Sequence, residues 1–327
     1  MLTAQSWLSS PEPLAMLSTT GLTKQFDQTI SVNQVNLQIN AGEIYGLIGP
    51  NGAGKTTLIR MLAAAEEPTA GEIYISGQRL LPDQPNPGIQ RQISFLPDDF
   101  PLYDDLNVVD YLDYFGRLYY LRQPELAQRI NQVLELVSLE NKRQSQISTL
   151  SRGMKQRLSL ARTVIHRPVL LLLDEPVSGL DPIARVQYRE TIKTLQTEGI
   201  TILISSHILS DLEDFCTSIG IMELGRLVES SQLQALYQRD RRGQQIIIAA
   251  LGEAAALQQV LQTMPLVTVC EILPSGNQVC IQFAGTNLEA ANLLRDLITG
   301  GWQITEFSPV QASLEEIFLK LGYQQTS

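Results

Sequence analysis

A glycine-rich segment near the N-terminus constrains the fold more than any other feature of this sequence. The segment matches GxxxxGK[ST] at every fixed position and reads Gly49-Pro50-Asn51-Gly52-Ala53-Gly54-Lys55-Thr56. An apolar stretch over residues 43–48 predicts a strand before it, and residues 57–65 predict a helix after it. Such glycines let backbone N–H groups approach phosphates, and the helix N-terminus adds partial positive charge. A chance glycine-rich turn would not match eight residues in this context, so the segment predicts a nucleoside triphosphate site.

The polar groups of this phosphate loop have distinct predicted roles. Lys55 is expected to act as a point charge on the β- and γ-phosphates, and the Thr56 hydroxyl is expected to bind Mg2+. The other loop residues predicted to bind the nucleotide are Gly49, Asn51, Gly52, Ala53, Gly54 and Thr57. The loop alone does not indicate what the triphosphate drives.

Two adjacent carboxylates supply the second half of the predicted site. Asp174 and Glu175 follow an apolar strand over residues 170–173, and α/β sheets place their ligands at the carboxyl ends of strands. Asp174 is expected to hold Mg2+, and Glu175 to polarise a water against the γ-phosphate. Two acids at the start of a solvated loop are the plainer alternative, which the phosphate loop disfavours.

Three further segments narrow the prediction. Residues 150–156 (LSRGMKQ) place a Ser and a Gly at a helix N-terminus, which predicts a second anion site with no second triphosphate in the same chain. Residues 178–181 (SGLD) follow the carboxylates directly. His207 ends a strand on the ligand side of the sheet, which favours a γ-phosphate contact. The only other histidine, His166, ends a helix and is predicted to be a helix C-terminal cation.

Residues 21–225 alternate short apolar strands with helical stretches, which predicts an α/β fold with a mostly parallel sheet. Together with the GxxxxGK[ST] segment, this order is typical of the P-loop NTPase fold. An all-helical insert over about 100–167 interrupts this alternation. The strands predicted are 44–48, 73–76, 93–96, 170–173, 201–204 and 219–223, and the helices of the insert are 108–121, 125–137 and 154–166.

The remainder of the chain predicts a smaller α+β domain. After a polar connector at 238–245, the pattern predicts the order βαββαβ, a ferredoxin-like motif, and a last helix over 314–321. The predicted elements are strands 246–250, 267–273, 278–283 and 302–307 and helices 253–264 and 287–298. The expected domains are therefore a flexible extension over 1–16, a nucleotide-binding domain over 17–237 and an accessory domain over 238–327.

Composition restricts the possible partners. The 327 residues carry 34 acidic and 24 basic side chains, which gives a net charge of -10. This charge argues against extensive nucleic-acid binding, so we expect no nucleic-acid partner. No stretch approaches the ~18 apolar residues that cross a bilayer. Residues 1–20 lack a basic start and contain two prolines, so they predict a frayed extension rather than a secretory signal.

Cys270 and Cys280 are predicted to be reduced packing thiols on a hairpin.

Taken together, the phosphate loop, the helical insert, LSxG, the carboxylate strand, SGLD and the histidine resemble, in this order, the ATP-binding subunit of ABC transporters. The resemblance covers roughly residues 17–230. It implies two subunits dimerising head to tail around two ATP molecules, with Ser151 and Gly153 of one chain on the γ-phosphate held by Lys55 of the other. It also implies that Asp181 organises the dimer face, that Glu175 is the general base and that His207 orients the γ-phosphate and water.

Phe26 matches the aromatic residue of that family that stacks on adenine, although an ordinary apolar residue before a strand remains the alternative. Two positions depart from the family pattern. The family's LSGGQ is LSRGM here, with Arg152 and Met154, and Asp98 stands where most members have Gln. A carboxylate can still bind Mg2+ or hold water, so the predicted metal ligands are Thr56, Asp98 and Asp174.

The LSRGMKQRLSLA segment and the C-terminal extension resemble prokaryotic exporter ATPases associated with multidrug, antibiotic, lipid or polysaccharide efflux. This resemblance implies an ATP-hydrolysing subunit, with ATP and Mg2+ as cofactors, a second copy of the chain as dimer partner and a separate integral-membrane permease. It places the chain in the cytoplasm, peripheral on the inner face of the membrane.

Two alternatives stay open. A soluble relative acting on ribosomes or DNA would usually carry two cassettes or a coiled coil, which this chain lacks. A nucleotide-dependent switch with little turnover gains weak support from Asp98. The presence of Lys55, Asp174, Glu175 and His207 argues against it.

Overall fold

The computed structural model describes residues 15–81, 86–239 and 244–310. The chain forms two compact units, one built from residues up to Gln232 and one that begins at Leu233. Each unit has a hydrophobic core of its own. Within the described residues, no helix combines the length and the apolar character needed to cross a membrane.

The first unit contains a six-stranded sheet in the order β11-β10-β4-β9-β8-β7. Five neighbouring strands run parallel and only β11 is antiparallel, as the predicted fold class requires. The inner strands β4, β8 and β9 are buried along their whole length, which explains their continuous apolar runs. The strands are β4 (Ile44–Ile48), β7 (Ile93–Leu96), β8 (Leu170–Leu173), β9 (Thr201–Ser206), β10 (Ser218–Glu223) and β11 (Arg226–Gln232).

A second, antiparallel sheet belongs to the same unit and was not predicted. Residues 15–20 were expected to be frayed, and this expectation is wrong because they lie in the longest strand of this sheet, β1. Register shifts along β1 and its many threonines interrupt the alternation that would have revealed it. Its strands are β1 (Ala15–Phe26), β2 (Thr29–Val35), β3 (Gln38–Asn40), β5 (Ala70–Ile75) and β6 (Gln78–Arg79).

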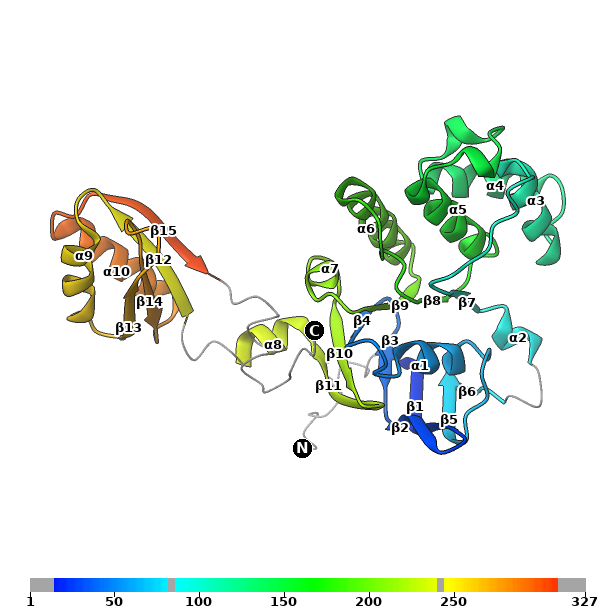
Figure 1. The fold of residues 1–327 in the computed structure, drawn as a ribbon, viewed down its shortest axis with the longest axis horizontal. Helices are drawn as coiled ribbons and strands as arrows, with labels where there is room; N and C mark the ends of the chain where they lie inside the picture. Colours follow the sequence, from blue (N-terminus) through cyan, green and yellow to red (C-terminus); the bar gives the residue numbers. More distant parts are fainter. Residues whose placement is uncertain (1–14, 82–85, 240–243, 311–327) are drawn as a thin grey trace, which may run out of the picture. The chain divides into compact units, whose positions relative to one another are not determined.

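Helix α1 (Lys55–Leu62) contributes to the large core that the two sheets share. Its buried side chains Leu58, Ile59, Met61 and Leu62 pack with core residues from both sheets. Figure 1 shows α1 above the strands β1 and β5. This packing fixes the helix whose N-terminus follows the phosphate loop.

The helical insert forms the separate lobe of α3, α4 and α5 in Figure 1. As predicted, it contains no strand among its described residues; the elements are α3 (Val108–Leu118), α4 (Glu125–Leu136), α5 (Arg152–Val164) and short 3₁₀ turns at Glu140–Lys142 and Ile147–Thr149. Two buried arginines close helix ends. Arg129 donates to the carbonyls of Val164 and Ile165, and Arg157 donates to that of Val137. These bonds satisfy carbonyls that a helix C-terminus leaves without partners.

His166 does not fit the prediction of a helix C-terminal cation. Its ring stacks on Tyr119 with centroids 3.7 Å apart, and Nε2 lies 3.2 Å from Ser94 Oγ. Burial lowers the pKa of His166 to about 4, and the charges of Arg129 and Arg162 also lower it, whereas a backbone hydrogen bond at Ile93 raises it. The imidazole is therefore neutral at physiological pH.

The remaining helices of the first unit connect the sheet strands. Helix α6 has 16 residues, more than any other described helix, and lies between β8 and β9 in the sequence. Short helices follow β6 and β9. The three are α2 (Pro87–Gln90), α6 (Pro182–Thr197) and α7 (Ser210–Glu213).

The second unit has the predicted βαββαβ order after a short first helix. Its antiparallel sheet has the order β13-β14-β12-β15, and Figure 1 shows α9 and α10 together beside one face. The elements are α8 (Leu233–Arg239), β12 (Gln244–Ala250), α9 (Ala254–Gln262), β13 (Val267–Ile272), β14 (Val279–Phe283), α10 (Asn287–Thr299) and β15 (Ile304–Val310). The predicted helix over 314–321 lies outside the described residues.

The thiols of the second unit cannot form a disulfide with each other in this arrangement. Cys270 pairs with Ile281, whereas Cys280 pairs with Glu271. Because paired residues share a face, the two cysteines lie on opposite faces of the sheet. Neither cysteine is part of a disulfide in the structure.

Candidate functional site

The phosphate loop joins the carboxyl end of β4 to the N-terminus of α1, and close backbone contacts require its glycines. A Cβ on Gly49 would lie 2.3 Å from the Met222 carbonyl oxygen, and one on Gly54 would lie 2.3 Å from that of Ser31. Gly54 also has a φ of +100° and serves as the N-cap of α1 without a side-chain cap. The first amides of α1 therefore remain available to an anion, as a phosphate cradle requires.

Lys55 lies at the start of α1 and is only 5% exposed. Its ammonium donates to the carbonyls of Gly49 at 2.6 Å and Pro50 at 3.3 Å, and it lies 3.4 Å from Glu175 Oε1. The buried charge is thus stabilised by the loop itself and by an opposite charge. A phosphate bound in the loop would take the place of these carbonyls as the partner of Lys55.

The two carboxylates after β8 are held by a serine of the neighbouring strand. Ser205 Oγ donates to Asp174 Oδ1 at 2.7 Å and accepts from the Glu175 amide at 2.9 Å. Sequence reasoning assigned Ser205 no role, because it predicted that the strand ends at residue 204. The parallel register pairs Leu173 with Ile204, so it brings the next residues of the two strands together. Strand register was the signal that would have found Ser205.

Glu175 occupies a position between Lys55 and His207. Its Oε2 lies 2.8 Å from His207 Nδ1, while Oε1 faces Lys55 and makes no hydrogen bond within the protein. The backbone of Glu175 has a φ of +47°, which is uncommon for a residue with a side chain. Three side chains from three different elements therefore converge at one point of the sheet edge.

Asp98 follows β7 and adds negative charge to this edge. Partial burial raises the pKa of Asp98, and the nearby charges of Asp174 and Glu175 raise it further, whereas Arg152 opposes the shift. No group of three or more His, Cys, Asp or Glu side chains within the described residues is arranged to hold a metal alone. The carboxylates of Asp98 and Asp174 and the hydroxyl of the exposed Thr56 suit Mg2+. This ion prefers oxygen ligands and is usually bound by one or two carboxylates together with phosphate oxygens of the substrate.

The comparisons with known proteins decide the family. The family model described as ABC transporter matches residues 32–178. The chain is 33% identical over 306 residues to an uncharacterised ABC transporter ATP-binding protein, YxlF of Bacillus subtilis, across 94% of this chain and 99% of that protein. It belongs to the ATP-binding subunits of ABC transporters. As a member of this family, the chain is an ATP-hydrolysing enzyme that binds adenine nucleotides.

Two further relatives of this ABC subunit bear on its function. It is 36% identical over 245 residues to the bacitracin transport ATP-binding protein BcrA of Bacillus licheniformis, across 75% of this chain and 78% of that protein. A solved dimeric bacterial ABC transporter cassette, MJ0796, superposes with a TM-score of 0.61 at 25% identity, across 67% of this chain and 99% of that one.

Other predicted site residues of the ABC subunit lie at helix ends, and no described contact joins them to the phosphate loop. Ser151 caps α5 by accepting from the Met154 amide, and Asp181 caps α6 by accepting from the Ala184 amide. A Cβ on Gly153 would lie 2.9 Å from the Cβ of Ala184, so this glycine has a packing role in its own chain.

Phe26 ends β1 and is 45% exposed, with Lys24 Nζ 4.8 Å from the centre of its ring. Such an exposed aromatic ring is available for stacking on a base. Adenine stacking by Phe26 stays a prediction.

The loop residues Asn51 and Gly52 are exposed, whereas Ala53 is buried and Thr57 accepts from Ser31 Oγ at 2.9 Å.

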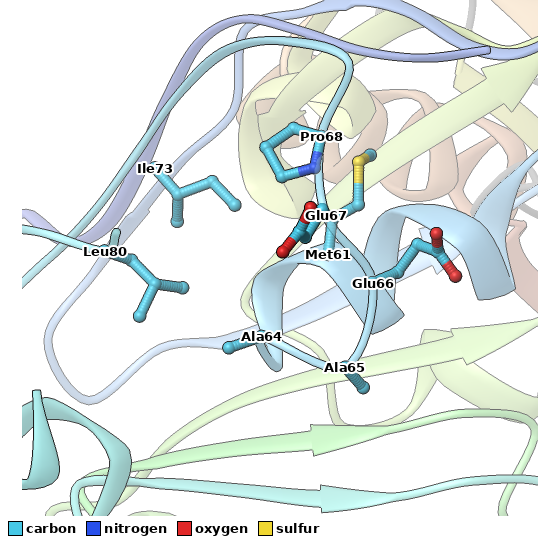
Figure 2. A pocket seen from close by; sticks show the side chains of 8 residues that line it. All are labelled: Met61, Ala64, Ala65, Glu66, Glu67, Pro68, Ile73 and Leu80. Atoms are coloured by element: carbon cyan, nitrogen blue, oxygen red, sulfur yellow. The ribbon is translucent and has the colours of Figure 1, made fainter. Parts of the chain in front are cut away.

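A pocket of about 250 Å³ lies elsewhere, at the C-terminal end of α1. Figure 2 shows its side chains around the turn that follows this helix. The phosphate loop precedes the opposite end of α1, so this pocket is not the nucleotide site. Its lining residues are Met61, Ala64, Ala65, Glu66, Glu67, Pro68, Ile73 and Leu80.

Proposed function

We propose that two copies of this chain close around two Mg2+-ATP molecules and that ATP hydrolysis by this dimer drives substrate export through a separate integral-membrane permease. In this proposal the chain works on the inner face of the membrane. The observation that carries the proposal is the position of the Glu175 carboxylate between Lys55 and His207.

The geometry of Glu175 suits a general base. His207 holds one carboxylate oxygen, so the other can accept a proton from a water that attacks the γ-phosphate. Lys55 would exchange its carbonyl partners for phosphate oxygens and stabilise the charge that develops there. Mg2+ would supply further positive charge, held by Thr56, Asp98 and Asp174.

The dimer accounts for the second anion site. The N-terminus of α5 carries Ser151 and Gly153, and its first turn contains no acidic residue. No described contact links it to the phosphate loop of its own chain, so a nucleotide from a second copy is its proposed ligand. The dimeric cassette with a similar fold supports this arrangement.

The relatives support export as the direction of transport. One is named for bacitracin transport and another, 36% identical over 221 residues, for Nod factor export. The permease is proposed as the partner because ABC ATP-binding subunits work with membrane permease components.

Purification of the tagged chain from detergent-solubilised cells tests the partner. A multi-span membrane protein that copurifies and stimulates ATP turnover is the expected result. Copurification of ribosomes without any membrane protein would favour the soluble alternative.

Dimer formation is tested with Glu175→Gln, which should bind ATP and accumulate as a dimer in size-exclusion chromatography with Mg2+-ATP. Glu190→Gln is the matched control, because Glu190 is an exposed acid on α6 whose partner is Lys193. A Glu175→Gln protein that binds ATP and stays monomeric would contradict the proposed dimer.

A further inference from the structure

Arg152 replaces a glycine of the usual LSGGQ motif, and its side chain contacts the SGLD loop of the same chain. Nη2 of Arg152 donates to the Ser178 carbonyl at 3.1 Å. A Cβ on Gly179 would lie 2.5 Å from three atoms of the guanidinium. The planar group therefore covers the backbone of the loop at Gly179, where an added side chain would displace the guanidinium.

A second close approach joins the start of α5 to the helix that follows the SGLD loop. The residue after Arg152 is Gly153, and a Cβ placed on it would approach Ala184 in the first turn of α6 to 2.9 Å. Gly179 has a φ of +65°, so its own backbone also favours glycine. The start of α5 and the loop leading into α6 are thus fitted to each other over two neighbouring residues.

The far side of the loop is held in a similar way. Arg185 on α6 donates to the Leu180 carbonyl at 3.1 Å and to Asp211 Oδ1 at 3.0 Å. Asp211 is only 6% exposed and lies on α7, four residues after His207. The carbonyls on both sides of Gly179 therefore accept from arginines, one on α5 and one on α6.

We propose that Arg152 is a positioning residue that holds the SGLD loop against the N-terminus of α5. The proposal rests on the proposed dimer, in which Ser151 and Asp181 face the partner copy. A charge-assisted bond to the Ser178 carbonyl makes these two segments move as one, so Arg152 sets the geometry of the dimer face. Because Arg152 does not contact Lys55, its removal leaves ATP binding by a single chain intact.

The test compares Arg152→Ala, Arg152→Lys and the control Arg189→Gln in the full-length chain. Arg189 also lies on α6 and pairs with Asp214, yet it makes no described contact with the SGLD loop. Amide hydrogen exchange of residues 176–181 without nucleotide reports the loop itself. ATP turnover and KM report catalysis, and melting temperature reports global folding.

Arg152→Ala removes one exposed charge-assisted hydrogen bond, so we expect faster amide exchange of residues 176–181. We also expect kcat to fall by roughly 3- to 10-fold and KM to change by less than about 2-fold. Arg152→Lys keeps a charge and a donor and should recover part of both effects. Arg189→Gln should match the wild type in exchange and kcat.

Unchanged exchange in folded Arg152→Ala would overturn the proposal, whether or not the wild type hydrolyses ATP. Increased exchange with wild-type kcat would overturn the role in turnover. If the wild type neither dimerises nor hydrolyses ATP, the proposed function fails, and the exchange measurement alone still decides whether Arg152 holds the loop.

Discussion

Glu175 Oε2 lies 2.8 Å from His207 Nδ1, which links the end of β8 to the residue that follows β9. The imidazole orients the carboxylate of Glu175, a residue whose backbone φ of +47° is itself uncommon. The Lys55 ammonium lies 3.4 Å from the other carboxylate oxygen, Oε1. The contacts with His207 and Lys55 together hold the Glu175 carboxylate, an otherwise weak base, in one orientation.

Replacement of His207 tests this orientation. We expect His207→Ala to lower kcat by roughly 10- to 100-fold, because a positioned proton-transfer group is lost or misplaced. Binding of ATP should change little, since Lys55 and the loop amides remain. Steady-state turnover and equilibrium nucleotide binding check both parts, and a variant with wild-type kcat would show that His207 does not orient the base.

The pair of Lys55 and Glu175 should be coupled in the nucleotide-free protein. Lys55→Ala leaves the Glu175 carboxylate, which is 14% exposed, without its opposite charge and should cost about 1–3 kcal/mol of unfolding free energy. The double variant with Glu175→Gln should cost less than the sum of the single variants, by at least ~0.5 kcal/mol. Urea unfolding measures all four proteins, and strict additivity would argue against the contact.

Asp98 is expected to reduce the stability of the empty site. Partial burial raises the pKa of Asp98, and the nearby charges of Asp174 and Glu175 raise it further, so its charge at neutral pH is unfavourable. Asp98→Asn should therefore stabilise the nucleotide-free protein by roughly 0.5 kcal/mol, a value typical of partly solvated charges. Because a bound cation offsets the repulsion, the gain should shrink with Mg2+-ATP, as measured by thermal unfolding. A gain that is equal with and without Mg2+-ATP would argue against metal binding at Asp98.

His166 predicts a pH dependence of stability. Its pKa of about 4 lies below the ordinary value of 6.5, so the unfolded chain binds more protons between these values. Its contribution is present above pH 6.5 and is lost as the pH falls towards 4, on the order of 1–2 kcal/mol. The unfolding free energy of the wild type minus that of His166→Gln should fall over this range. A difference that does not change with pH would contradict a neutral buried imidazole.

The parallel sheet was readable from the sequence because its inner strands are buried on both faces. Strands 44–48, 93–96 and 170–173 have the predicted bounds, since each is a short, mostly apolar run that is followed directly by Gly49, Pro97 or Asp174. The antiparallel sheet was missed. Its longest strand, β1, mixes Ser, Thr and Lys with apolar residues and changes register, so no clear period of two survives.

The convergence of the site could also be predicted, because parallel strands bring their carboxyl ends to one edge. This rule places Asp174 and His207 beside the phosphate loop. It does not reveal Ser205, which depends on strand register, or the contact of Arg152 with the SGLD loop, which depends on side-chain reach between two helices. The burial of His166 was hidden for the same reason, since its stacking partner Tyr119 comes from another helix end.

ATP turnover by the wild type and by Glu175→Gln, measured under the same conditions with Mg2+ and any copurified membrane partner, is the most direct test of the catalytic role of Glu175. We expect the variant to retain ATP binding and to lose turnover by at least ~100-fold, because the general base is removed while Lys55 and the loop remain. Equal turnover in the two proteins, or none in the wild type with its partner present, would contradict the assignment of Glu175 as the catalytic base of a transport ATPase.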